Sequence, residues 1–166
     1  MDCQMAECLL ISHARRELQQ EEAEAVDRHV AVCASCRRRL ERTAELLQIL
    51  QQSSEPDVVS LLDEILGLAL ECGASDVHLE PDAEGVRVRV RVDGVLHEVK
   101  RLPRSAHIPL ISRIHVMSDT DALRPDIPQV SRLHVRTDEL EAYARVAVCP
   151  TYWGPRATIR ILPAER

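Results

Sequence analysis

The run of residues that most constrains the fold is 86–92, in which valine and arginine alternate at every position. A period of two residues places the valines on one face of a strand and Arg87, Arg89 and Arg91 on the other. An Asp-Gly dipeptide follows at 93–94 and is typical of a two-residue hairpin turn. The sequence therefore predicts a half-buried strand that ends in a tight hairpin.

Two further segments alternate in the same way and flank this strand. Residues 75–80 precede a turn at 81–85 that is rich in Asp, Ala, Glu and Gly, and residues 95–99 follow the hairpin. Because short turns join antiparallel neighbours, the three segments predict one antiparallel three-stranded unit.

Helical spacing of apolar residues appears on either side of this unit. A helix is predicted over 58–72, with Gly73 as its stop, and a second over 105–118. Alternation predicts strands at 132–136, 141–150 and 156–162. We expect residues 56–166 to form an α/β sandwich-like domain with a mainly antiparallel sheet and two covering helices.

The first fifty residues read as helical throughout. Leu9, Leu10, His13 and Leu18 suggest a first short helix, a second opens at Gln20, and a third runs from 35 to about 52. Residues 51–56 are polar and end in a proline, which predicts a boundary between domains 1–52 and 56–166. The expected class is α+β.

A cluster of metal-ligand types lies between the second and third predicted helices. His29 and Cys33 are one helical turn apart, so their side chains leave the same face, and Cys36 adds a thiol at the Cys-x-x-Cys spacing of tetrahedral zinc sites. A fourth ligand has to come from elsewhere, and Cys3 and Cys8 both precede the helix.

This pattern resembles the zinc-binding domain of anti-sigma factors, over residues 1–50. The resemblance implies Cys3 as the fourth ligand, because the family's first cysteine lies two residues after the initiator Met; Cys8 is the alternative. Four protein ligands leave no open position, so the zinc would be structural. It would stabilise a helical domain too small to bury much surface by itself.

Residues 74–81 (ASDVHLEP) and 88–99 (VRVRVDGVLHEV) resemble the segment that precedes the motor in bacterial type II secretion and type IV pilus assembly ATPases. The match continues through 112–117, 128–129, 150–156 and 159–162, and so covers about residues 60–163. The resemblance implies that Arg89 and Arg91 lie near the nucleotide held by the motor. On composition alone, the Arg87–Arg89–Arg91 face is a solvated surface; with the resemblance, it is predicted to be an interaction surface.

Two features of that ATPase family are missing here. None of the five glycines begins a GxxxxGK[ST] phosphate loop. At 124–132 the sequence reads RPDIPQVSR, where the family has an arginine pair and then PQDGR. We therefore expect no enzymatic activity from this chain; ATPase activity would require a motor domain after residue 166.

Composition limits the class of partner and the compartment. A net charge of −6 and a pI near 5.6 argue against nucleic acid or an anionic membrane as partner. No segment has the length and apolarity of a membrane-inserted helix, and the N-terminus lacks a secretory signal. Six cysteines without an export signal indicate thiols or metal ligands, and hence the cytoplasm.

The sequence favours a non-enzymatic, zinc-binding adaptor or regulator related to these ATPases. Its partner would be a protein, either a sigma factor or a secretion or pilus motor component, or a second copy of the chain. The alternative is the N-terminal part of a longer secretion or pilus ATPase whose motor follows residue 166. A further alternative is an anti-sigma or redox-sensing zinc regulator.

Overall fold

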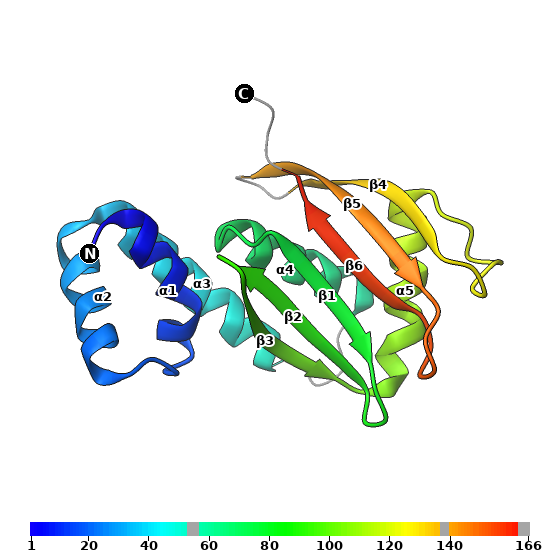
Figure 1. Ribbon diagram of the computed structural model, residues 1–166, viewed down its shortest axis with the longest axis horizontal. Coiled ribbons are helices and arrows are strands. Elements are labelled where there is room, and N and C mark those ends of the chain that lie inside the picture. Colours follow the sequence, from blue (N-terminus) through cyan, green and yellow to red (C-terminus); the bar gives the residue numbers. More distant parts are fainter. Residues whose placement is uncertain (53–56, 137–139, 163–166) are drawn as a thin grey trace.

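A six-stranded antiparallel sheet with two helices on one face forms the larger part of the molecule (Figure 1). The structure, a computed structural model, describes residues 1–52, 57–136 and 140–162. The strands are β1 (Asp76–Pro81), β2 (Val86–Val92), β3 (Val95–Leu102), β4 (Gln129–Arg136), β5 (Glu141–Cys149) and β6 (Arg156–Ile161). Their order across the sheet is β3-β2-β1-β6-β5-β4.

The sheet consists of two three-stranded meanders, β1-β2-β3 and β4-β5-β6, which join through β1 and β6. β1 pairs with β2 and β2 with β3, while β4 pairs with β5 and β5 with β6. The meanders meet where β1 pairs antiparallel with β6, from Asp76 opposite Arg160 to Leu79 opposite Ala157. Segments about eighty residues apart thus form the centre of the sheet.

Local chemistry places the β2–β3 turn and the helix α4 where the sequence predicts them, whereas β4 begins at Gln129, three residues before its predicted start, and β3 runs on to Leu102. Asp93 and Gly94 both have positive φ, +48° and +83°, as a tight hairpin turn requires. The helix α4 (Val58–Glu71) begins at Asp57, whose carboxylate accepts hydrogen bonds from Val59 N–H and Ser60 N–H. It ends before Gly73, which has a φ of +66°.

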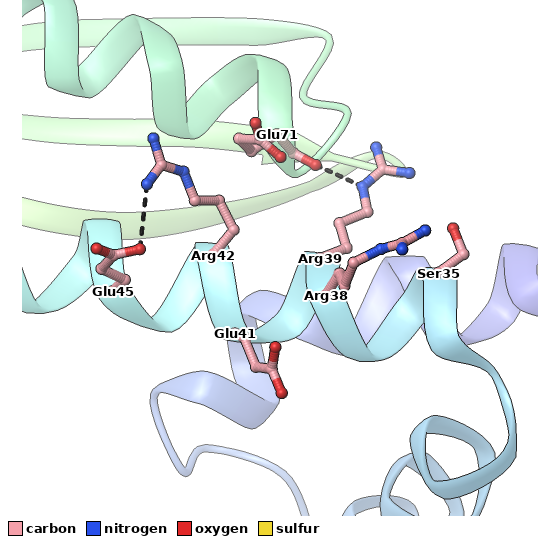
Figure 2. Close-up of a pocket in the computed structure, with 7 residues that line it drawn as sticks. All are labelled: Ser35, Arg38, Arg39, Glu41, Arg42, Glu45 and Glu71. Carbon is pink, nitrogen blue, oxygen red and sulfur yellow. Dashed lines mark hydrogen bonds and ion pairs between the residues drawn. The ribbon is translucent and has the colours of Figure 1, made fainter. Parts of the chain in front are cut away.

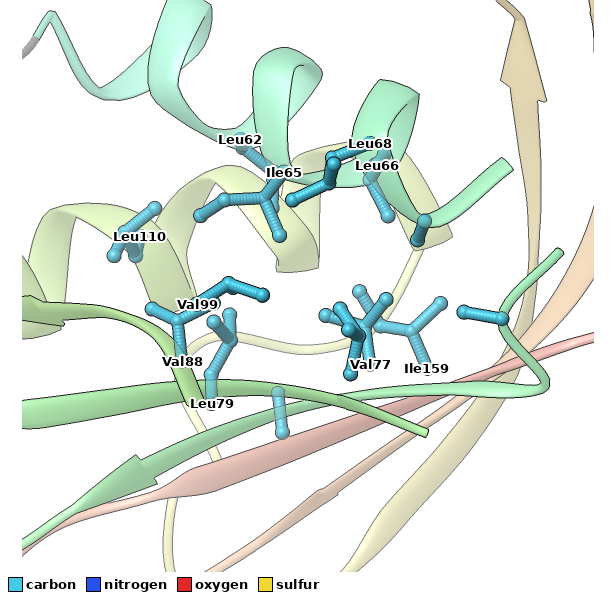
Figure 3. Packing of buried hydrophobic residues seen from close by; sticks show 14 of the residues in the cluster. Leu62, Ile65, Leu66, Leu68, Val77, Leu79, Val88, Val99, Leu110 and Ile159 are labelled. Carbon is cyan, nitrogen blue, oxygen red and sulfur yellow. The ribbon is translucent and has the colours of Figure 1, made fainter. Parts of the chain in front are cut away.

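The core lies between the sheet and the helices α4 and α5 (His107–Ser118), the second of which follows a short 3₁₀ turn, η1 (Arg104–Ala106). Figure 3 shows the leucines and isoleucine of α4 and Leu110 of α5 pointing toward aliphatic side chains of the sheet. In β2 the valines are buried and alternate with half-buried arginines, as the sequence predicts. Their side of the sheet is therefore the packed one.

The first three helices lie beside the β3 edge of the sheet (Figure 1). They are α1 (Cys3–Ala14), α2 (Gln20–Val32) and α3 (Ala34–Gln52). The buried Ile11, Leu46 and Leu47 belong to the same apolar cluster as the side chains between sheet and helices. At the edge itself, Ser12 Oγ lies 3.5 Å from Nδ1 of His97.

The first helix starts earlier than the sequence suggests. α1 begins at Cys3 because the Asp2 carboxylate accepts a hydrogen bond from Met5 N–H at 2.8 Å. It ends at Ala14, so Leu18 lies outside it. The predicted class, α+β with a helical segment before an antiparallel sheet, is confirmed.

The predicted division at residues 52 to 56 falls largely on residues 53–56, outside the described part of the chain, and it stays a prediction. Among the described helices, none is long and apolar enough to cross a bilayer.

Candidate functional site

The structure brings Cys3, His29, Cys33 and Cys36 together although they come from three different helical segments. Their ligand atoms all lie within 4.8 Å of one another. Cys3 Sγ is 3.8 Å from Cys33 Sγ, and His29 Nε2 is 3.3 Å from Cys36 Sγ. Bonds of about 2.3 Å in a tetrahedral zinc site separate two sulfurs by about 3.8 Å, so this donor set fits a metal ion.

Each ligand is positioned by an element end. Cys3 is the first residue of α1, His29 lies in the last turn of α2, and Cys33 joins α2 to α3. Cys36 is in the first turn of α3 and is 1% exposed. Three thiols and an imidazole, one of them buried, form a set typical of structural zinc sites.

The three thiols have different acidities. Hydrogen bonds from the Cys36 backbone N–H, and then from the neighbouring thiols, lower the pKa of Cys33 to about 7. Burial raises the pKa of Cys36 to about 12, and the hydrogen bond with Cys33 raises the pKa of Cys3. Cys33 is thus the thiol that most readily forms the thiolate that metals bind.

Cys8, the alternative fourth ligand, lies outside this cluster. Five positions along α1 from Cys3, it points to a different side of the helix, and its Sγ donates to the carbonyl of Gln4 at 3.1 Å. A hydrogen bond with Asp93, followed by burial, raises its pKa to about 11. The geometry therefore selects Cys3 as the residue that accompanies the other three.

The arginines of β2 pair with carboxylates of β1 and the turn after it. Arg89 Nη2 lies 2.6 Å from Glu80, Arg87 Nε 3.4 Å from Asp82, and Arg91 Nε 3.6 Å from Asp76. Their side chains keep 26–38% of their surface exposed. The predicted interaction surface is thus a half-buried ionic network on the open face of the sheet.

Asp76 anchors this network at the centre of the sheet. It is 4% exposed and accepts hydrogen bonds from Arg160 Nε at 2.9 Å and from Ser75 Oγ at 2.8 Å. Burial by itself would raise the pKa of Asp76, but the hydrogen bonds and the charge of Arg160 outweigh it and hold the pKa below its usual value.

A groove of about 450 Å³ lies between α3 and the C-terminal end of α4 (Figure 2). Arg39 crosses it: its Nε donates to the Glu71 carbonyl oxygen at 2.5 Å, and its Nη1 lies 2.8 Å from a Glu7 carboxylate oxygen. Arg39 therefore links α1, α3 and α4, and it joins the metal-ligand helices to the sheet domain.

Sequence reasoning missed Arg39, because nothing in the run Arg37–Arg39 distinguishes the inward guanidinium from its neighbours. The closeness of Arg39 to Gly73, where an added Cβ would lie 3.1 Å from Arg39 Nη2, appears only once α3 and α4 are packed together. Sequence reasoning also missed the turn between β5 and β6, in which Tyr152 and Trp153 are exposed.

Comparison with known proteins identifies the family of the chain from residue 50 onward. Residues 50–166 match the family model described as "Type II/IV secretion system protein". The chain belongs to the Type II/IV secretion system protein family. The match covers all six strands of the sheet together with α4 and α5, whereas the four metal-ligand residues precede it.

Several members of the Type II/IV secretion system protein family resemble this chain. Type II secretion system protein E of Pseudomonas aeruginosa is 36% identical over 125 residues, which are 75% of this chain and 25% of that protein. Type IV pilus assembly ATPase PilB of Myxococcus xanthus is 34% identical over 123 residues, 74% of this chain and 22% of PilB.

Among solved structures, the pilus retraction motor PilT with bound ADP is 27% identical, with a TM-score of 0.49, over 63% of this chain and 29% of PilT. The chain spans about a quarter of the length of the curated relatives it matches.

Proposed function

We propose that this chain is the N-terminal, pre-motor part of a type II secretion or type IV pilus assembly ATPase. The observation that carries the proposal is the family match over residues 50–166, in a chain that spans only about a quarter of its ATPase relatives. ATP hydrolysis would then belong to a motor domain encoded after Arg166. The sheet domain would position that motor and connect it to the secretion or pilus machinery.

In this proposal the helical segment is a zinc-stapled module added in front of the sheet domain. Cys3, His29, Cys33 and Cys36 would hold one zinc ion, and all four coordination positions would be filled by protein. The metal would hold three short helices together, while Arg39 and the shared apolar cluster dock them on the sheet domain. The role of the metal would be structural, and the binding partner of the helical module would be a protein.

The Arg87–Arg89–Arg91 face is the proposed contact with a neighbouring protein or with the motor. The sheet face that carries these side chains is opposite the one covered by α4 and α5. Pairing with Asp82, Glu80 and Asp76 holds the guanidinium groups in place while leaving part of each exposed. Guanidinium groups held in this way are suited to bidentate contacts with carboxylates or phosphates.

A second candidate function is an adaptor that acts without a motor. It is favoured by the segment between α5 and β4, where the family's arginine pair and glycine turn do not occur in the sequence RPDIPQVSR. There the Gln129 side chain closes the loop, with Nε2 donating to the carbonyls of Asp121 and Arg124 at 2.8 and 2.9 Å. The loop is held by an amide rather than by arginines available to phosphate.

The size of the native gene product separates the two candidates. An antibody against residues 57–136 would be used to isolate the protein from its source cells for intact-mass and peptide analysis. The ATPase proposal expects a protein much larger than 18.7 kDa whose peptides include a GxxxxGK[ST] loop. A product of only 18.7 kDa would contradict it and support the adaptor.

A further inference from the structure

The turn between β5 and β6 presents aromatic side chains that the core does not use. The chain contains three aromatic residues of the Phe, Trp and Tyr types, and all of them are exposed. Tyr152 is 90% and Trp153 40% exposed, and their rings lie 4.9 Å apart in an edge-to-face arrangement. Two adjacent exposed aromatic residues in a chain with an aliphatic core mark a candidate interaction surface.

This turn is rigid. Thr151 N–H donates to the Gly154 carbonyl at 3.1 Å, and Gly154 N–H donates to the Thr151 carbonyl at 3.2 Å. On the inner side, Nε2 of the buried His107 donates to the Pro155 carbonyl oxygen at 2.7 Å, which ties the turn to the start of α5. A partner would therefore meet a turn whose backbone is already ordered, at a low cost in conformational entropy.

The surroundings of the turn are basic and apolar. The Arg104 guanidinium carbon lies 5.7 Å from the centre of the Trp153 ring, and Arg156 is exposed at the start of β6. Within the described residues no ion pair joins either arginine to a carboxylate, and Asp82 and Glu84 of the turn between β1 and β2 pair with Arg101. Ile108, the second residue of α5, is 59% exposed.

We propose that this surface, formed by Arg104, Ile108, Tyr152, Trp153 and Arg156, docks an acidic protein segment that carries aliphatic side chains. Tryptophan, tyrosine and arginine are the residues that contribute most to protein interfaces. The guanidinium groups of Arg104 and Arg156, which form no ion pair within the described ranges, favour carboxylates. The proposal does not depend on whether a motor domain follows.

Trp153 provides a direct readout because it is the single tryptophan of the chain. The purified chain is titrated with a short peptide in which Glu and Asp alternate with Leu, and Trp153 fluorescence is followed. We expect saturable binding that weakens with added salt. Tyr152→Ala, and Arg104→Gln combined with Arg156→Gln, should each weaken binding about tenfold.

The matched control is Tyr143→Ala, which removes the third exposed aromatic residue, on β5 away from the turn. This variant should bind like the wild type. Three results would overturn the proposal: no saturable change, equal binding of a peptide with Gln and Asn in place of the acids, or equal weakening by Tyr143→Ala. A response of Trp153 to anionic phosphatidylglycerol vesicles but not to the peptide would also overturn it and assign the surface to a membrane.

Discussion

Arg39 closes the C-terminal end of α4: its Nε donates to the Glu71 carbonyl oxygen at 2.5 Å while its Nη1 lies 2.8 Å from Glu7. The last carbonyls of a helix have no partner within the helix and carry partial negative charge, so a cation there both satisfies and stabilises them. One side chain from the metal-ligand helices thus contributes to the stability of the sheet domain.

Replacing Arg39 should lower the stability of the protein, because its contacts with Glu71 and Glu7 would be lost. For Arg39→Ala we expect the free energy of unfolding to fall by about 1–3 kcal/mol, since the change removes a charged hydrogen bond and an ion pair. Arg38→Ala is the matched control, because this exposed neighbour has no partner among the described residues, and it should stay within about 0.5 kcal/mol. Urea unfolding followed by circular dichroism measures both, and equal losses would refute the role of Arg39.

The metal site predicts a sharp contrast between two cysteines. Wild type and Cys8→Ser should contain one zinc per chain, whereas Cys3→Ser should lose it, because only Cys3 lies with the other three ligands. Elemental analysis of the purified proteins gives the stoichiometry. Zinc loss of the same size in both variants would show that the fourth ligand is assigned wrongly, and a metal-free wild type would remove the site.

Asp76 should make the free energy of unfolding fall at low pH. Its folded pKa is lowered, so its contribution is complete above the unfolded value, about 3.9, and is lost as the pH falls through the folded value. Near neutral pH, Asp76→Asn should cost about 1–3 kcal/mol of unfolding free energy. The gap between wild type and variant should narrow as the pH falls below about 4. A gap that stays constant down the pH series would contradict this sign.

An arginine that pairs with a half-buried carboxylate should contribute more to stability than an exposed arginine without such a pair. Arg89→Gln leaves Glu80 half-buried without its 2.6 Å partner, and we expect a loss of about 1 kcal/mol. Arg145→Gln on β5, exposed and without an ion pair in the described residues, should change stability by less than about 0.5 kcal/mol. Thermal unfolding of the two variants side by side tests this; a neutral Arg89→Gln would return β2 to a merely solvated face.

Gly154 is predicted to resist substitution for two reasons. Its φ is +115°, and an added Cβ would lie 2.5 Å from His107 Cε1. Gly94, at φ +83°, has open space around it, so Gly94→Ala carries the backbone cost without the contact. We expect Gly154→Ala to be about 1–2 kcal/mol the more destabilising of the two. The contact with His107 is tested by combining Gly154→Ala with His107→Ala. If this double variant loses as much stability relative to His107→Ala as Gly154→Ala loses relative to the wild type, the contact is not the cause of the greater cost at Gly154.

Much of the fold followed from local patterns. The alternation at 86–92 predicts a strand with buried valines, and the helical stripe before Gly73 predicts α4, because side-chain period and turn chemistry are properties of neighbouring residues. Leu18 was misassigned for the opposite reason: α1 is set by the Asp2 cap at its start, which apolar spacing does not reveal.

The sequence by itself determined the order of the helices and strands, the family and three of the four clustered metal-ligand residues, since His29, Cys33 and Cys36 lie within one short segment. Only the tertiary structure decided between Cys3 and Cys8, joined β1 to β6, and turned Arg39 toward Glu71. Each of these outcomes depends on how elements far apart in the chain pack against one another. Packing of that kind is set by the shape and burial of whole faces rather than by any local pattern of residues.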